Sequence, residues 1–189
     1  MHPVEALFVP LGRALRNRRP DEALSLAEDP AFATSTRLAL TSPSFADGEV
    51  IPAKHCGPLI GANISPALEW SAVPAETADL LLVMEDLDIP GGTPGLHTVV
   101  AFAPTRGGLA EGALRTDDPR VRFLPTRFGR AQYAGPRPLP GHGPHRYRFH
   151  LYALDAVVDL GQVAGTSQLP AAVDGHVLAS GTLLGTRTT

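Results

Sequence analysis

The chain has 189 residues, of which 43% are hydrophobic and 19% are charged, and its formal net charge is -3 at pH 7. A chain of this length is typical of one domain that buries its core without cross-links. The small negative charge provides no basic field, so we expect neither nucleic acid nor an anionic membrane as a partner. Cys56 is the only cysteine, which excludes an intrachain disulfide and a cysteine-based zinc site and predicts a small buried apolar residue.

The start of the chain lacks the long apolar core and the small-residue cleavage site of a secretory signal. No window approaches the ~20 apolar residues that a membrane span requires. The sequence therefore predicts a cytoplasmic protein without a membrane span.

Residues 4–18 have the pattern of a short amphipathic helix that Pro10 limits. Its apolar positions recur at spacings of three and four: Val4, Leu7, Leu11, Ala14 and Leu15. We expect this face to cover the domain body or a subunit partner; contact of its arginines with a membrane surface is the alternative. Residues 20–37 are predicted to be a linker or arm, so we separate an N-terminal region, 1–37, from a main domain, 38–189.

From residue 38 onward, short apolar or alternating runs separated by Gly and Pro predict strands. The predicted strands are 38–41, 49–51, 68–70 with Trp70 inward, 80–84, 97–102 and 146–154. Residues 115–132 are polar and aperiodic, which indicates a functional lid or a surface excursion. Residues 168–178 are predicted to be helical. We therefore expect a mainly β fold, a two-sheet antiparallel β-sandwich with a short N-terminal helix and a C-terminal helix.

Two acidic residues follow the most apolar predicted strand, which ends at Met84. Asp86 and Asp88 alternate along an extended backbone and are expected to share a face just before Pro90. Paired carboxylates raise each other's pKa and attract a proton, a cation or hydrogen-bond donors. His97, at the start of the next strand, is a candidate to join them.

A second polar group follows a loop at residues 135–144 that is rich in Gly and Pro. Such a loop is stiff and lacks bulky side chains, so it is suited to presenting backbone N–H groups to an anion. His145 and Tyr147 follow it on one face of the next strand. His142 in the loop and His150 on the opposite strand face are predicted to lie outside the site, and Arg146 is predicted to form a structural salt bridge.

In their order and spacing these motifs resemble the phosphatidylethanolamine-binding proteins, in particular the bacterial branch described as Raf-kinase-inhibitor-like. The resemblance covers residues 38 to 185 and lies in Ser65–Trp70, Asp86-Leu87-Asp88-Ile89-Pro90, His97, Tyr133–Pro136, Gly143–Tyr147 and Leu151–Asp155. It implies a two-sheet β-sandwich with a small anion-binding cavity and a homodimer. The chain departs from the usual family pattern at Leu87, Ile89, Gly95, Thr98 and Arg187.

The resemblance also implies the site residues. By motif position the cavity is lined by Asp86, Asp88, His97 and His145, its wall is shaped by Pro90 and Tyr147, and its loop contributes Gly135 and Pro136. A pair of imidazole rings, each held charged or in the correct tautomer by an aspartate, would receive a phosphoryl or carboxylate group together with the loop N–H groups.

The leading hypothesis is a binding protein for a small anionic or phosphorylated ligand, without catalytic residues, cofactor or metal of its own. By analogy with the family it would regulate or inhibit a kinase or a protease as protein partner. Two alternatives stay open at this point. The Asp and His residues form only a buried hydrogen-bond network, or they serve a metal-dependent or other hydrolase.

Overall fold

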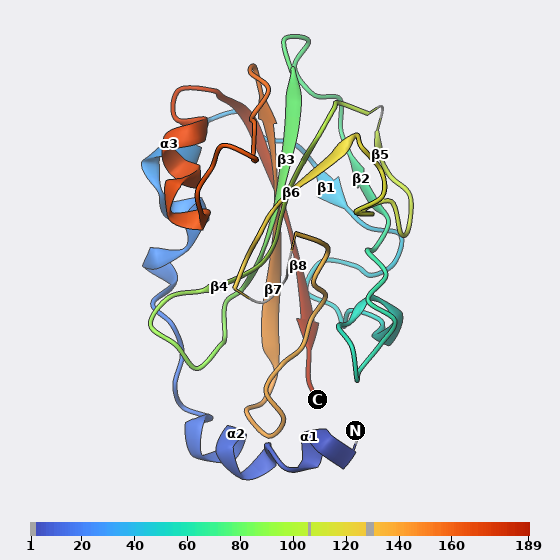
Figure 1. The fold of residues 1–189 in the computed structure, drawn as a ribbon, viewed down its shortest axis with the longest axis vertical. Coiled ribbons are helices and arrows are strands. Elements are labelled where there is room, and N and C mark those ends of the chain that lie inside the picture. The colour runs from blue at the N-terminus through green and yellow to red at the C-terminus, as the bar shows by residue number, and fades with distance from the viewer. Residues whose placement is uncertain (1–2, 106, 128–130) are drawn as a thin grey trace.

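The computed structural model describes residues 3–105, 107–127 and 131–189, which form two antiparallel sheets (Figure 1). The smaller sheet has the order β1 (Leu40–Thr41), β2 (Leu68–Trp70), β5 (Gly108–Leu109). The larger sheet has the order β6 (Val121–Leu124), β4 (Gly95–Phe102), β3 (Asp79–Asp86), β7 (His145–Leu154), β8 (Val177–Arg187). The prediction of a mainly β fold with two antiparallel sheets is confirmed.

Strand β3 is the central strand of the larger sheet and is buried on both faces. Leu82 and Met84 face the smaller sheet in one core, whereas Leu81 and Val83 face outward into a second core. Trp70 points inward, as predicted, and lies 6.2 Å from the ring of Phe102. Burial on both sides explains why the run is continuously apolar and does not alternate.

The second core is covered by an arm that follows the N-terminal helices and by α3 (Leu169–Val173), as Figure 1 shows. The arm consists of three 3-10 turns: η1 (Glu22–Leu24), η2 (Leu26–Glu28) and η3 (Pro30–Phe32). The side chains of Asp21, Ser25 and Asp29 each accept a hydrogen bond from the backbone N–H two residues later. Phe32 is buried and lies 4.8 Å from the ring of Tyr152. The arm is thus part of the packed domain.

The C-terminal prediction is partly wrong. The helix predicted over 168–178 is limited to η5 (Thr166–Gln168) and α3, and the chain then forms the long strand β8. Gly181 and Gly185 lie within this strand. A Cβ at Gly181 would be 2.7 Å from the Leu38 carbonyl oxygen, and one at Gly185 would be 2.4 Å from Ile51 Cγ1. The glycines therefore serve close packing across the strand.

Two other segments also differ from the prediction. Residues 49–51 form no strand of their own, because Val50 makes only an isolated parallel bridge to Thr186 beside β8. The segment 115–132, read as a lid or an excursion, contains the edge strand β6, which pairs with β4. Residues 128–130 of that segment lie outside the described chain.

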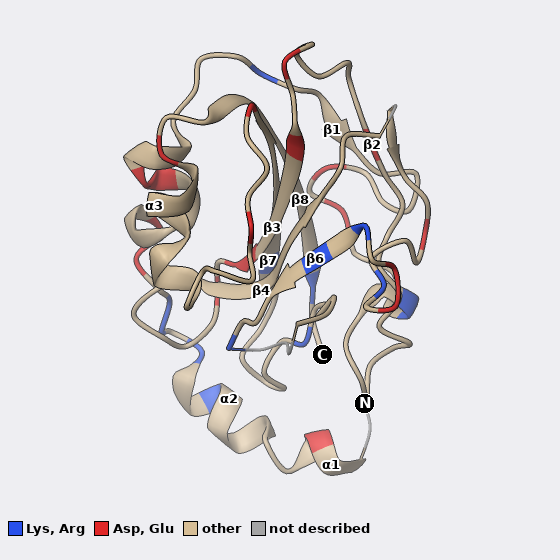
Figure 2. Cartoon of the chain, turned by 45° about the horizontal axis from the view of Figure 1, so that its top comes forward, with Lys and Arg blue, Asp and Glu red and all other residues tan. Residues whose placement is uncertain are grey.

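The N-terminal helix is present but broken. Instead of one helix over 4–18, the chain forms α1 (Pro3–Ala6) and α2 (Val9–Leu15). In Figures 1 and 2 both helices lie across one end of the sandwich, far from α3. The short helix η4 (Ala53–His55) precedes the loop that reaches the same end. None of the described helices is long and apolar enough to cross a membrane.

Candidate functional site

The site forms at the edge of the larger sheet where β3 ends and its two neighbours, β4 and β7, begin. Asp86 is the last residue of β3 and pairs with Tyr147 of β7 and with Gly95 of β4. Antiparallel pairing therefore places His97 and His145 beside Asp86, although His145 follows it by 59 residues. A register shift between Met84 and Glu85 lies just before this point in the β3–β4 ladder.

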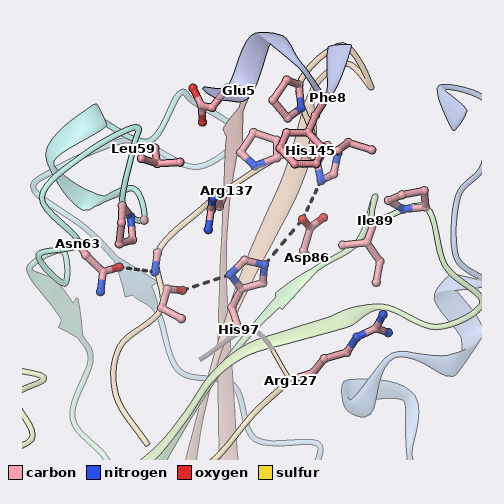
Figure 3. A pocket seen from close by; sticks show the side chains of 18 of the residues that line it. Glu5, Phe8, Leu59, Asn63, Asp86, Ile89, His97, Arg127, Arg137 and His145 are labelled. Atoms are coloured by element: carbon pink, nitrogen blue, oxygen red, sulfur yellow. Dashed lines mark hydrogen bonds and ion pairs between the residues drawn. The ribbon is translucent and has the colours of Figure 1, made fainter. Parts of the chain in front are cut away.

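A cavity of about 820 Å³ opens at this end of the sheet (Figure 3). Five of the eight predicted site residues line it: Asp86, Pro90, His97, Gly135 and His145. The remaining wall is contributed by loop residues and by the N-terminal helices, with Asn63, Arg127 and Arg137 as further polar members. These three residues were not predicted from the sequence, in which their position beside loops is the one signal.

Asp86 is the centre of the polar group. Its Oδ2 accepts a hydrogen bond from His145 Nδ1 at 2.7 Å, and its Oδ1 accepts one from the Asp88 backbone N–H at 2.8 Å. His97 Nε2 lies 3.8 Å from the same Oδ2, beyond hydrogen-bond distance. The side chain of Asp86 is 1% exposed. A buried carboxylate in this setting is oriented by His145 and faces His97 across a gap.

His97 is neutral near pH 7. Burial lowers its pKa, and the opposing effects of Asp86 and of the Ala134 carbonyl do not compensate. Its Nδ1 lies 3.2 Å from the Ala134 oxygen, so Nδ1 carries the proton and Nε2 faces Asp86 as an acceptor. Its ring packs edge-on against Tyr147 at 5.3 Å. Of the two states expected for this ring, charged or held in one tautomer, His97 therefore has the second, because burial disfavours the charged form more than Asp86 favours it.

Asp88 does not line the cavity, contrary to prediction. The chain turns after Asp86, so the alternation expected of a strand does not extend to Asp88. Its Oδ2 accepts hydrogen bonds from the Arg146 backbone N–H at 2.8 Å and from Arg146 Nε at 2.9 Å. Burial alone would raise the pKa of Asp88, but its contacts with Arg146 and the charge of Arg19 hold it below its ordinary value. The structural salt bridge predicted for Arg146 is confirmed.

Tyr147 and Pro136 lie behind the cavity wall. Burial, with the charge of Asp86, raises the pKa of the Tyr147 phenol, and in the described chain its hydroxyl has no hydrogen-bond partner. The Pro136 carbonyl accepts a hydrogen bond from the Gly57 N–H at 2.9 Å. At Gly135 a Cβ would lie 2.0 Å from the His55 oxygen, so only glycine fits there. These residues hold the wall in place.

His142, predicted to lie outside the site, is buried and contacts a site residue. It is 2% exposed, and its Nδ1 lies 2.8 Å from His145 Nε2. Its Nε2 lies 2.9 Å from Arg19 Nη1 and 3.1 Å from the Arg18 carbonyl oxygen. Gly143, with a φ of 111°, turns the loop so that His142 reaches His145. The sequence signal for this contact is the position of His142 three residues before His145, with Gly143 and Pro144 between them.

His150 lies on the far face of the sheet from the cavity. Its Nε2 is 3.2 Å from Glu85 Oε2, and Glu85 also accepts hydrogen bonds from Ser25 Oγ at 2.6 Å and from the Leu26 N–H at 2.9 Å. Burial opposes ionisation of Glu85, but these contacts outweigh it and lower the pKa. Among the described residues, no cluster of three or more His, Cys, Asp or Glu side chains is arranged to hold a metal ion.

Residues 41–188 match the phosphatidylethanolamine-binding protein family. The chain belongs to this family. It is 38% identical over 149 residues to LppC of Mycobacterium tuberculosis, which is described as a candidate lipoprotein; the match covers 79% of this chain and 71% of LppC. A UPF0098 protein of Chlamydia trachomatis is 38% identical over 154 residues, covering 79% of this chain and 97% of its own.

Solved structures of this family agree with the fold. A phosphatidylethanolamine-binding protein homologue from Chlamydia trachomatis superimposes with a TM-score of 0.71 at 35% identity, covering 82% of this chain and 99% of that one. Escherichia coli YbcL gives a TM-score of 0.72 at 24% identity, covering 82% and 99%, and supports the fold alone. The predicted membership is confirmed, and residues 1–40 lie outside the family match.

Proposed function

We propose that the protein binds a small anion with a protonated phosphate-type group in this pocket and catalyses no reaction on it. The observation that carries the proposal is the 3.8 Å gap between Asp86 Oδ2 and His97 Nε2 at the cavity wall. Both atoms accept hydrogen bonds, because Asp86 is paired with His145 and His97 has its proton on Nδ1. A ligand that brings an O–H donor to this gap can donate it to either acceptor.

A phosphate monoester is the ligand class that fits. Its second pKa is about 6, so at pH 7 about one tenth of the free ester retains a P–OH group, the donor that the gap requires. Its ionised oxygens would be received by the guanidinium groups of Arg127 and Arg137, which line the same cavity. Membership of the phosphatidylethanolamine-binding protein family supports a phosphate-type ligand.

Comparison of phosphate with sulfate tests this proposal. The two anions have the same shape, but sulfate has no proton to donate to Asp86 near neutral pH. We expect phosphate to stabilise the protein against heat, by about 1.4 kcal/mol at ten times its Kd, and sulfate to do so much less. Asp86→Asn should abolish the preference, because an amide also donates. Asp155→Asn, which changes an exposed carboxylate, is the control.

A wild-type protein that responds to neither anion would contradict the proposal and favour a purely structural role for the Asp and His residues. Turnover of a phosphate or carboxylate ester that falls in Asp86→Asn would favour the hydrolase alternative. Regulation of a kinase or protease, the homodimer and the cytoplasmic location stay predictions.

A further inference from the structure

The N-terminal segment, residues 3–19, lies over the mouth of the pocket. Val4, Glu5 and Phe8 line the cavity, and Figure 3 shows Glu5 and Phe8 at the rim on the same side as His145. The family match begins only at residue 41. This chain thus builds part of its pocket from a segment that precedes the family domain.

The segment is seated on the Gly/Pro-rich loop by backbone contact. A Cβ at Gly12 would lie 2.0 Å from the Pro140 oxygen and 2.7 Å from the His142 nitrogen. On the opposite side of the contact, Gly141 has a φ of 83°, and a Cβ there would lie 2.6 Å from the Val9 oxygen. Only glycine at position 12 allows α2 to approach the loop this closely.

A polar latch, formed by Arg19, Asp88 and His142, ties the end of the segment to the site. Arg19 Nε lies 3.1 Å from Asp88 Oδ1, and Arg19 Nη1 lies 2.9 Å from His142 Nε2. His142 in turn contacts His145, which contacts Asp86. The latch therefore connects the segment directly to the centre of the pocket.

Much of the rest of the segment is exposed. In residues 3–19 only Glu5 and Gly12 are buried, whereas Leu7 is 77% exposed and Leu11 is 50% exposed. Segments with few buried apolar contacts open locally at low free-energy cost, while the core stays folded. The segment can therefore leave the mouth without unfolding the sandwich.

We propose that residues 3–19 are a lid that restricts this pocket to phosphate monoesters free in solution. The proposal rests on the function proposed above and specifies its ligand class. A free ester enters during an opening of the lid and is then covered. A phosphate group fixed in a bilayer cannot be covered, because α1 and α2 would have to occupy the position of the membrane surface.

Two probes with the same phosphate monoester group distinguish a ligand free in solution from one fixed in a bilayer. They are glycerol 3-phosphate, and phosphatidylcholine vesicles that contain phosphatidic acid. Two variants unseat the lid by different means. Gly12→Ala introduces the clash with Pro140, and Arg19→Gln removes the charge of the latch. Arg13→Gln is the control, because it removes the same charge from an exposed position on α2.

We expect the wild-type protein and Arg13→Gln to bind glycerol 3-phosphate and not the vesicles. Gly12→Ala and Arg19→Gln should release glycerol 3-phosphate about tenfold faster, since the first separates α2 from the loop and the second loses a charge-assisted contact. Both variants should also bind the vesicles, and glycerol 3-phosphate should compete with the vesicles for the pocket. Vesicle binding by the wild type, with or without phosphatidic acid, would overturn the proposal and identify the segment as a membrane contact.

A ligand-independent measurement keeps the lid testable if glycerol 3-phosphate does not bind, a result that would contradict the proposed function itself. Diethyl pyrocarbonate modifies accessible neutral imidazoles, and peptide mass spectrometry reports its rate at His145. We expect this rate to rise about tenfold in Gly12→Ala and Arg19→Gln and to stay unchanged in Arg13→Gln. Equal rates in all four proteins would show that the segment does not cover the pocket.

Discussion

At the residue scale, the chemistry of the site depends on which of its titratable side chains are kept neutral by burial. Asp86 and His145 were predicted from the sequence because Asp86 follows an apolar strand, His145 follows a Gly/Pro-rich loop, and both match family motifs. The neutral state of His97 was not predictable, since it depends on burial that only the folded chain supplies. The placement of Asp88 and His142 was missed for a related reason: each contacts Arg19, from a segment that no local pattern connects to the pocket.

His97 and His142 make stability depend on pH. Burial, together with neighbouring positive charge at His142, lowers both pKa values below the ordinary 6.5. Between these lowered values and 6.5 the unfolded chain binds more protons than the folded one. The two histidines therefore contribute fully to the free energy of unfolding above about pH 6.5, and this contribution decreases as the pH falls below 6.5.

Urea unfolding over this range should show a loss of up to about 1.4 kcal/mol per pH unit for each histidine. His97→Asn and His142→Asn should each make the dependence shallower. A wild-type stability that does not fall between about pH 6.5 and pH 5 would contradict this account.

At the element scale, the strands with uniform or alternating patterns were predictable, and those defined by their neighbours were not. Strands β3, β4 and β7 are apolar or alternate regularly. Strand β8 contains Gly181 and Gly185, which are typical of turns, and its pairing with β7 depends on contacts with Leu38 and Ile51 from distant segments. Local propensity could not reveal these long-range contacts.

Gly185→Ala tests the packing at β8. The new methyl group would lie 2.4 Å from Ile51 Cγ1 and 2.9 Å from Phe45 Cε2, so we expect a loss of about 1–3 kcal/mol in the free energy of unfolding. Gly165→Ala is the control, because nothing lies within 4 Å of its Cβ position. Equal stabilities of the two variants in chemical denaturation would refute the packing role of Gly185.

Ser25→Ala tests how the arm is attached. It removes the hydroxyl that donates to Glu85 Oε2 at 2.6 Å and leaves a buried carboxylate with one donor fewer. We expect a loss of about 1–3 kcal/mol and faster amide exchange in η2. Ser35→Ala, at an exposed position of the same arm, should have little effect. An unchanged exchange rate in Ser25→Ala would show that other contacts hold the arm.

At the scale of the whole molecule, the predicted division between residues 1–37 and 38–189 does not coincide with the packing. Residues 3–19 contact the domain mainly at the pocket mouth, whereas residues 20–37 contribute Phe32 to the second core. The sequence indicated an arm because its three turns lack an apolar period. Each turn is stabilised by one local side-chain cap, a signal too short to predict where it packs.

Two truncations test this division. Removal of residues 1–19 should leave a cooperative thermal transition within a few degrees of that of the intact chain. Removal of residues 1–37 exposes Tyr152 and the apolar face that Phe32 covers, so we expect loss of cooperative unfolding or aggregation. Equal stability of the two truncated proteins would mean that the arm contributes no more to the fold than the lid.

The end of β3 has a consequence for how this chain can change during evolution. Glu85 and Asp86 are adjacent and face opposite sides of the sheet, one toward the arm and one toward the pocket. Insertion or deletion of a single residue in β3 would exchange their sides and remove both carboxylates from their partners at once. Apolar residues in this strand are therefore free to interchange with others of similar volume, whereas the length of the strand is fixed.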